Sequence, residues 1–381
     1  MMKRLLKFLG VVVALLVLAV VGAVAALVLS APRTARPVGI QQVLARDPGG
    51  KPIAVTVFYP TAEKPRLIRL GIGFLWLAPK AAVEPGRHPL VVISHGTGGG
   101  ALSHLDTALA LAGAGYVVAA PMHTGDNILD QSKVGTSAWF IDRSRQIARV
   151  NDYLLNAWPA HDRLDPSRIG LFGFSAGGTT ALITIGGAPD LARVGPHCHT
   201  QPEFACTLMR SGTGLRAPAP SEWTHDPRVR AAVVAAPGLG FAFEPNGLSA
   251  IRAPVQLWQG AADTSVPPAT NADVVRRGLT VAPEFHLVEN AEHFSFLAPC
   301  GVNAVMLPKM LCADPRGFDR SAFHAKFNVA VIGFFDRSLG APPASERPRR
   351  PHDLELSWGM SDLHPTQTTS LPACAKRRRP P

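Results

Sequence analysis

The sequence predicts an α/β protein with a mostly parallel central sheet and helices on both faces. Two observations predict this class. Apolar runs of strand length alternate with amphipathic stretches from about residue 36 to 340, and 47% of the 381 residues are apolar whereas 17% are charged. Strands of a parallel sheet covered on both sides are continuous apolar runs. The same composition excludes a mainly disordered chain, which would be charge-rich and apolar-poor.

The expected strands and helices follow one another along this body. Residues 53–59 alternate as in an early, half-exposed strand, whereas residues 89–94 form a continuous β-branched run typical of a buried strand. The clearest amphipathic helix covers residues 142–158 and ends at Pro159. We expect further strands at residues 116–120, 168–174, 230–236, 254–259 and 284–289, and helices at residues 104–114, 176–185 and 321–339.

The chain divides into three parts by composition. Residues 1–34 are expected to be a signal peptide or membrane anchor, and residues 35–340 the α/β domain. Residues 188–228 interrupt the strand–helix rhythm with Pro, Gly, His and two Cys, which indicates a small insertion over the edge of the sheet. Residues 341–381 are rich in Pro, Arg and Ser without periodicity, so we expect a disordered tail.

The net charge of +11 lies mainly in the terminal segments. Residues 1–36 carry five Lys or Arg and no acid, and residues 341–381 carry seven Lys or Arg against four acids. The body between them is left nearly balanced. The sequence therefore does not indicate a basic nucleic-acid-binding face on the folded domain.

The N-terminus has the pattern of an export signal. Three cations within residues 1–7 precede 22 residues of only Phe, Leu, Gly, Val and Ala at residues 8–29. The small residues at 30–31 would permit cleavage, but the apolar run is also long enough to span a bilayer. Both alternatives place the rest of the chain outside the cytoplasm, periplasmic, extracellular or membrane-anchored.

The cysteines agree with export. In an oxidising compartment the close spacings predict two local disulfides, with Cys374 left alone in the tail. Free buried thiols are the alternative. Neither pair has C-x-x-C spacing, so zinc binding is disfavoured and no metal is expected. The expected pairs are Cys198 with Cys206 and Cys300 with Cys312.

A Gly-Phe-Ser-Ala-Gly run at residues 173–177 lies between an expected buried strand and an expected helix. This is a G-x-S-x-G nucleophile elbow in the context that the motif requires. A sharp strand-to-helix turn exposes the Ser175 hydroxyl at the edge of the sheet, and the flanking glycines let neighbouring backbone pass close by. A tight glycine turn without function is the competing interpretation.

A serine nucleophile needs a base, and the base needs an orienting acid. Asp263 follows the expected strand at residues 254–259, and His293 follows the next one. The order Ser175, Asp263, His293 is that of hydrolases with a nucleophile elbow. Three further residues are poorer candidates, because His286 lies inside a strand and neither Asp226 nor Asp273 closes one.

The loop at residues 94–100, Ser-His-Gly-Thr-Gly-Gly-Gly, offers backbone N–H groups for a developing oxyanion. The second donor expected is the N–H of Ala176, directly after the nucleophile. His95 is expected to form structural hydrogen bonds under this loop. A phosphate-binding loop is disfavoured, because the run lacks the G-K-[ST] ending.

Taken together, these residues match the pattern of a known family. The body resembles the α/β-hydrolase superfamily, and within it the predicted dienelactone hydrolases related to platelet-activating-factor acetylhydrolases. The resemblance covers about residues 38–339 and implies Ser175 as nucleophile, His293 as base, Asp263 as its orienter, and oxyanion donors at Thr97 and Ala176. The matching segments are residues 57–60, 94–96, 173–178, 260–263, 292–296 and 314–319.

The expected function is hydrolysis of a small-molecule carboxylic ester through an acyl-enzyme. The namesake dienelactone hydrolases use a cysteine nucleophile, whereas this chain has serine, which favours an ordinary ester over a dienelactone. No cofactor is expected. Two alternatives remain: a serine peptidase of the same fold, and a membrane-tethered module that binds ligands without catalysis.

Overall fold

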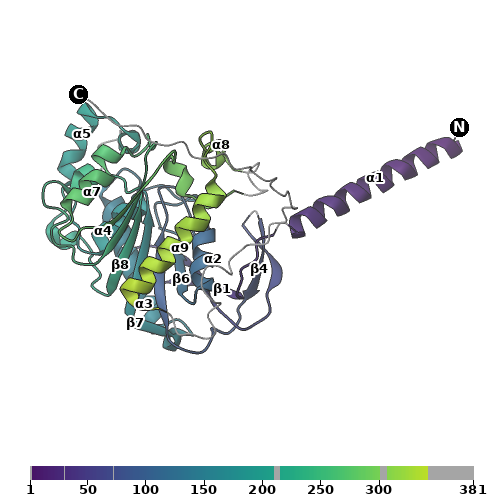
Figure 1. Ribbon diagram of the computed structural model, residues 1–381, viewed down its shortest axis with the longest axis horizontal. Coiled ribbons are helices and arrows are strands. Elements are labelled where there is room, and N and C mark those ends of the chain that lie inside the picture. Colours follow the sequence, from purple (N-terminus) through teal and green to yellow (C-terminus); the bar gives the residue numbers. More distant parts are fainter. Residues whose placement is uncertain (1, 30, 72, 210–214, 301–306, 342–381) are drawn as a thin grey trace, which may run out of the picture. The chain divides into compact units, whose positions relative to one another are not determined.

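The computed structural model describes residues 2–29, 31–71, 73–209, 215–300 and 307–341 (Figure 1). Within them, ten strands form one sheet in the order β10-β9-β8-β7-β5-β6-β2-β1-β4-β3. The strands are β1 (Val38–Ala45), β2 (Ile53–Pro60), β3 (Arg66–Leu70), β4 (Gly73–Pro79), β5 (His88–Ser94), β6 (Val117–Pro121), β7 (Leu164–Phe174), β8 (Val229–Ala235), β9 (Val255–Gly260) and β10 (Glu284–Val288).

The strands from β5 to β10 pair in parallel, and β2 joins them antiparallel to β6. β1 pairs antiparallel with β2 and parallel with β4, and β3 closes the order as a hairpin with β4. The prediction of a mostly parallel sheet is confirmed. The carboxyl ends of β5, β7, β8, β9 and β10 consequently lie at one edge, where loops can bring distant residues together.

The helices cover both faces of this sheet. Alternate residues along each buried strand enter two separate cores, one packed under α3, α4 and α7 and the other under α2 and α9. Figure 1 shows α9 and α2 crossing the sheet on the same side. These helices are α2 (Leu105–Gly113), α3 (Ser137–Asn156), α4 (Ala176–Thr184), α7 (Ala272–Gly278) and α9 (Arg320–Leu339).

Two expected boundaries are wrong. α3 begins at Ser137, five residues before the expected start, because Trp139 and Phe140 extend its buried side. β7 begins at Leu164 rather than 168, because an irregular first part pairs Leu164 with His88 before the regular ladder starts.

The expected insertion holds short helical segments that connect two loops at the carboxyl edge. At one side the Arg216 carbonyl accepts a hydrogen bond from Ser137 Oγ (2.7 Å), at the start of α3. At the other, Glu203 accepts from Asn271 Nδ2 (3.0 Å), at the start of α7. Its described helices are η2 (Leu191–Arg193), α5 (Val194–Thr200), α6 (Phe204–Leu208) and η3 (Pro220–Glu222).

Both expected disulfides are present in the structure. The bond between Cys198 and Cys206 joins α5 to α6, and the bond between Cys300 and Cys312 ends at α8 (Lys309–Cys312). Cys374 and the expected tail from residue 342 onward lie outside the described residues.

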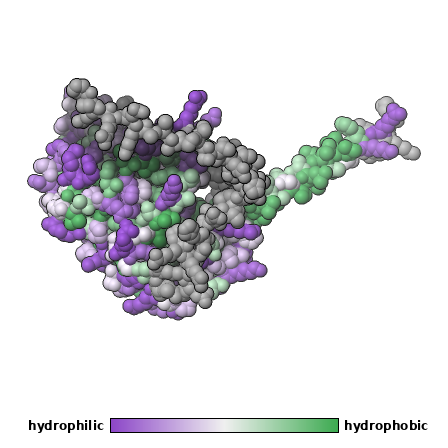
Figure 2. All heavy atoms as spheres, in the orientation of Figure 1, coloured by the Kyte–Doolittle hydropathy of each residue, from purple (hydrophilic) through white to green (hydrophobic). Residues whose placement is uncertain are grey.

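The N-terminal segment forms α1 (Met2–Leu29), whose window from Lys7 to Ala26 has a mean hydropathy of 3.0 and is not buried. By length and composition this helix could cross a membrane, and a signal sequence would meet the same criterion. Figure 2 shows its apolar length in green and hydrophilic residues at its N-terminal end.

Candidate active site

Ser175 occupies the sharp turn between β7 and α4. Its φ of 55° and ψ of −119° are unusual for a residue with a side chain, and such strain persists only where the surroundings impose it. Here the Ser175 N–H donates to the Ala235 carbonyl (3.0 Å), while the Ser175 carbonyl accepts from Gly178 (2.8 Å) and Gly238 (3.2 Å). The backbone of β8 and of the following loop therefore holds the turn in place.

The two glycines of the motif are required by close backbone approach. A Cβ added at Gly173 would lie 2.1 Å from the Gly177 carbonyl oxygen, and one added at Gly177 would lie 2.0 Å from the Ser94 carbonyl oxygen. Real Cβ atoms do not approach backbone oxygens so closely. The first turn of α4 can pack against the end of β5 only without these side chains.

The structure brings Ser175, His293 and Asp263 together. His293 begins η6 (His293–Phe296), its Nε2 lies 3.0 Å from Ser175 Oγ, and its Nδ1 lies 2.8 Å from Asp263 Oδ2. An ionised carboxylate can only accept, so the Nδ1–H donates to Asp263 and leaves Nε2 to accept from the serine hydroxyl. This arrangement can remove a proton from Ser175 as its oxygen attacks.

The Asp263 side chain is fully buried and held from several sides. Its Oδ1 accepts from the backbone N–H groups of Ser265 (3.0 Å) and Val266 (2.8 Å), and its Oδ2 from Gln259 Nε2 (3.3 Å) as well as His293. The His293 side chain is itself only 5% exposed. These contacts hold the carboxylate against the imidazole and the imidazole against the serine hydroxyl.

The three weaker candidates from the sequence form ion pairs or hydrogen bonds with residues other than Ser175. His286 on β10 pairs with Glu284 (2.9 Å) and stacks on Trp258. The other two carboxylates each pair with one nearby arginine, Asp226 with Arg228 and Asp273 with Arg276.

The expected oxyanion donors lie on segments that touch the nucleophile. A Cβ added at Gly96 would be 3.3 Å from Ser175 Cβ, so the loop after β5 runs directly beside the serine. No hydrogen bond within the described part of the chain occupies the Thr97 N–H. The Ala176 N–H is one of the donors that the start of α4 leaves without an intrahelical partner.

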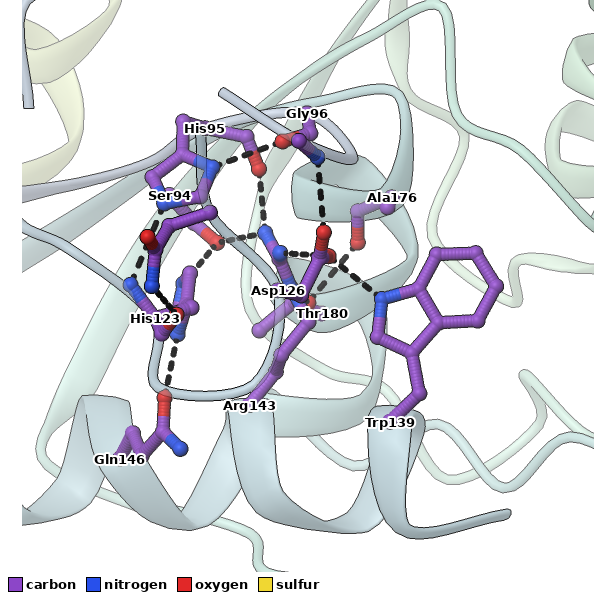
Figure 3. Close-up of polar contacts among 12 residues, drawn as sticks. Ser94, His95, Gly96, His123, Asp126, Trp139, Arg143, Gln146, Ala176 and Thr180 are labelled. Carbon is purple, nitrogen blue, oxygen red and sulfur yellow. Dashed lines mark hydrogen bonds and ion pairs between the residues drawn. The ribbon is translucent and has the colours of Figure 1, made fainter. Parts of the chain in front are cut away.

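A buried polar cluster behind this loop was missed in the sequence (Figure 3). Asp126, in the loop after β6, pairs with Arg143 of α3, and both side chains are at most 2% exposed. Arg143 was detectable, because it shares a helix stripe with Ile147, Val150 and Leu154 and is a charged residue on the side that should be buried.

Two histidines belong to the same cluster. The His123 Nδ1–H donates to Gln146 Oε1 (2.8 Å), and His123 Nε2 accepts from the Ser94 hydroxyl (2.9 Å). His95 donates to the Gly96 carbonyl (2.7 Å), in agreement with its expected role under the loop. Burial and nearby Arg143 lower the pKa of His95 to about 4 and the pKa of His123 well below its usual value, so both rings are neutral at pH 7.

The residues that the structure describes contain no group of three or more His, Cys, Asp or Glu side chains placed to hold a metal ion. The charged side chains at the site are instead hydrogen-bonded to protein groups, as for Asp263 and Asp126.

Comparisons with known proteins agree with the architecture. Residues 75–205 match the dienelactone hydrolase family. Among solved structures, a ferulic acid esterase from Streptomyces cinnamoneus superposes with a TM-score of 0.58 at 22% sequence identity, covering 84% of this chain and 96% of that chain. No curated protein matches the sequence. The α/β-hydrolase fold and the likeness to dienelactone hydrolases are thereby confirmed.

Proposed function

We propose that this chain, an α/β-hydrolase of the dienelactone hydrolase type, cleaves carboxylic esters with Ser175 as nucleophile, His293 as general base and Asp263 as its orienting acid. The observation that carries the proposal is the continuous hydrogen-bonded chain from Ser175 Oγ through the imidazole to the buried carboxylate, at 3.0 and 2.8 Å. The family match and the esterase neighbour support the same reaction class.

In the first half-reaction Ser175 Oγ attacks the ester carbonyl carbon while its proton passes to His293 Nε2. The carbonyl oxygen becomes an oxyanion, which the N–H groups of Thr97 and Ala176 stabilise. The bond to the alcohol oxygen then breaks, and His293 returns the proton to that oxygen. Asp263 stabilises the imidazolium formed between these steps, and in the neutral imidazole it keeps the proton on Nδ1.

In the second half-reaction water replaces the alcohol. Its oxygen attacks the acyl-serine carbonyl carbon as His293 Nε2 takes the water proton, and the same N–H groups stabilise the second oxyanion. The bond to Ser175 Oγ breaks, and the imidazolium returns the proton to the serine. The carboxylic acid is released with the site in its starting state.

The test compares wild type with Ser175→Ala in hydrolysis of a short aryl acetate. We expect a loss of at least about 1,000-fold in kcat, since removal of a triad member leaves only the oxyanion donors and binding. Ser249→Ala, which alters an exposed serine, is the matched control. Undiminished turnover by Ser175→Ala would contradict the proposed nucleophile.

The same assay separates the two alternatives. A peptidase of this fold would also cleave the matching aryl amide at a readily measured rate, whereas an esterase would leave the amide essentially uncleaved. A ligand-binding module without catalysis would leave a fluorophosphonate probe unreacted, whereas the proposed enzyme reacts with it at Ser175. We expect ester cleavage without measurable amide cleavage, and probe labelling that Ser175→Ala abolishes.

We also propose that the domain works outside the cytoplasm. The exposed apolar α1 and the disulfide pairs support this location, because disulfides persist in oxidising compartments. Fractionation with an alkaline wash distinguishes an uncleaved anchor, which stays with the membrane, from a cleaved signal, which releases the domain. Recovery of a fully reduced protein from the cytoplasm would contradict the proposal.

A further inference from the structure

The charged pair Asp126–Arg143 is unusual in its burial. Taking two charges out of water is costly, and replacing such pairs by apolar residues is often neutral or stabilising. With side chains at most 2% exposed, this pair is therefore weak evidence for stability alone. The hydrogen bonds of the pair connect it to the loop after β5 and to the start of α4.

The carboxylate of Asp126 holds the loop that follows β5. Its Oδ1 accepts from the Gly98 N–H (2.7 Å), directly after Thr97, and Gly98 has the left-handed φ of 64° that such a turn requires. Its Oδ2 accepts from Arg143 and from Trp139 Nε1 (2.5 Å), both on α3. The carboxylate thus fixes the position of Thr97 relative to α3.

The guanidinium of Arg143 holds the two neighbouring segments. One terminal nitrogen donates to the His95 carbonyl and to Ser94 Oγ (3.2 Å), at the end of β5. The Nε donates to Thr180 Oγ1 (2.9 Å), and Thr180 in turn donates to the carbonyl of Ala176 (2.8 Å). Figure 3 shows these bonds converging on the one side chain.

We propose that Asp126 and Arg143 act as a positioning pair that sets the distance between the two oxyanion donors, the N–H groups of Thr97 and Ala176. The inference rests on the proposed function. Thr97 and Ala176 lie on separate segments, after β5 and at the start of α4, and oxyanion donors work only when they are fixed before the charge develops. The planar fork of Arg143, joined to Asp126, is the rigid link between the segments.

The variants Asp126→Asn and Arg143→Lys test the pair. In Asp126→Asn the side chain keeps its shape and an acceptor for the Gly98 N–H, but it presents an NH₂ donor to Arg143. In Arg143→Lys the positive charge remains, but the planar guanidinium with its several N–H donors is lost. We expect kcat to fall about 10- to 100-fold, as for a small misplacement of catalytic groups, with KM within about threefold. Amide hydrogen exchange of residues 96–100 should rise in both variants, which a readout of activity alone would not reveal.

A second ion pair, in which only the carboxylate is buried, provides the control. Asp226 precedes β8, at the opposite edge of the sheet from Ser175, and it bonds Arg228 (2.8 Å) and Asn151 (3.0 Å). Asp226→Asn should lower stability but leave kcat per folded molecule within about twofold. Should Asp126→Asn fail to fold, Thr180→Val removes the hydroxyl that joins Arg143 Nε to the Ala176 carbonyl and keeps both members of the pair, and we expect a kcat loss of about 3- to 10-fold.

The outcomes separate the two proposals. Activity that survives Ser175→Ala counts against the proposed function. Activity that requires Ser175 but is unchanged in Arg143→Lys and Thr180→Val, or an equal kcat loss in Asp226→Asn, overturns the positioning role alone. Unchanged hydrogen exchange at residues 96–100 in Arg143→Lys would overturn it as well.

Discussion

His104 is expected to make the protein acid-sensitive, and His104→Leu to relieve this. The ring is 1% exposed and packs between Phe172 and Phe174, with centroids 5.0 and 5.2 Å away. Neither ring nitrogen makes a hydrogen bond of normal geometry among the described residues, although the nearby Phe296 backbone opposes part of the effect of burial. Burial lowers the pKa of His104 to about 3, from an ordinary value of 6.5, with Asp106 opposing that shift and His324 adding to it.

The size of the effect follows from this pKa. Below pH 6.5 the unfolded chain binds a proton at this histidine, whereas the folded protein stays neutral there until about pH 3. Stability is therefore lost as the pH falls, by about 1.4 kcal/mol per pH unit. Between pH 7 and pH 5, His104 should cost about 2 kcal/mol in the free energy of unfolding. His95 and His123, whose pKa values are also lowered, likewise reduce the stability of the folded state as the pH falls. The variant His104→Leu keeps these two contributions.

At pH 7 the expected change is also favourable. Leu has a volume close to that of His and removes two buried nitrogens without partners, each of which costs about 1 kcal/mol or more when unsatisfied. We therefore expect His104→Leu to be at least as stable as wild type at pH 7. At pH 5 the difference in free energy of unfolding should favour the variant by about 2 kcal/mol more than at pH 7.

Urea unfolding followed by circular dichroism, in mild detergent and with the disulfides intact, measures both quantities. His199→Leu, a change at an exposed histidine, is the matched control and should leave the pH dependence as it is. A variant that loses about 2 kcal/mol at pH 7 and keeps the wild-type pH dependence would refute the reasoning, because it would mean that His104 makes a favourable bond in the folded state.

Three further predictions concern the site and its surroundings. Gly177→Ala should lower kcat at least about 100-fold in a folded protein, since its Cβ would lie 2.0 Å from a backbone oxygen at the end of β5; Gly113→Ala, where nothing lies within 4 Å, should be neutral in the same assay. Asp263→Asn should lower kcat about 10,000-fold with little change in KM, because the amide favours the wrong imidazole tautomer; a loss below tenfold would contradict the assigned role. Replacing Cys198 and Cys206 together by Ala should lower the free energy of unfolding by about 2–3 kcal/mol relative to the oxidised wild type, measured by urea titration; after reduction, which also breaks Cys300–Cys312 in both proteins, variant and wild type should match.

The sequence predicted the parts of the site that local constraints determine. The elbow at Ser175 needs a buried strand, two small residues and a helix start in immediate succession, and all of these are visible in a short stretch of sequence. Asp263 and His293 were found because each follows a strand whose neighbours in the parallel sheet end at the same edge. For these two residues the order and direction of the strands were enough to predict that the side chains meet.

What the sequence did not predict depends on contacts between distant segments. The pairing of β1 with β2 and β4, and the β3–β4 hairpin, follow from registers that alternation alone does not determine. The partner of Arg143 could not be named either, because Asp126 is one of several acids in loops and only the folded chain brings it near α3.

Several residues that violate ordinary folding rules lie near the candidate nucleophile. Ser175 has a strained backbone, and Asp126 and Arg143 are charged yet buried. Each such feature has a free-energy cost of about 1–3 kcal/mol or more, and none is needed to close the two apolar cores. A fold that needed only stability would replace them with apolar residues and a relaxed turn. Their presence at the carboxyl edge of β5 and β7 is therefore what we expect if selection at this edge acts on the position of an attacking oxygen and its oxyanion donors.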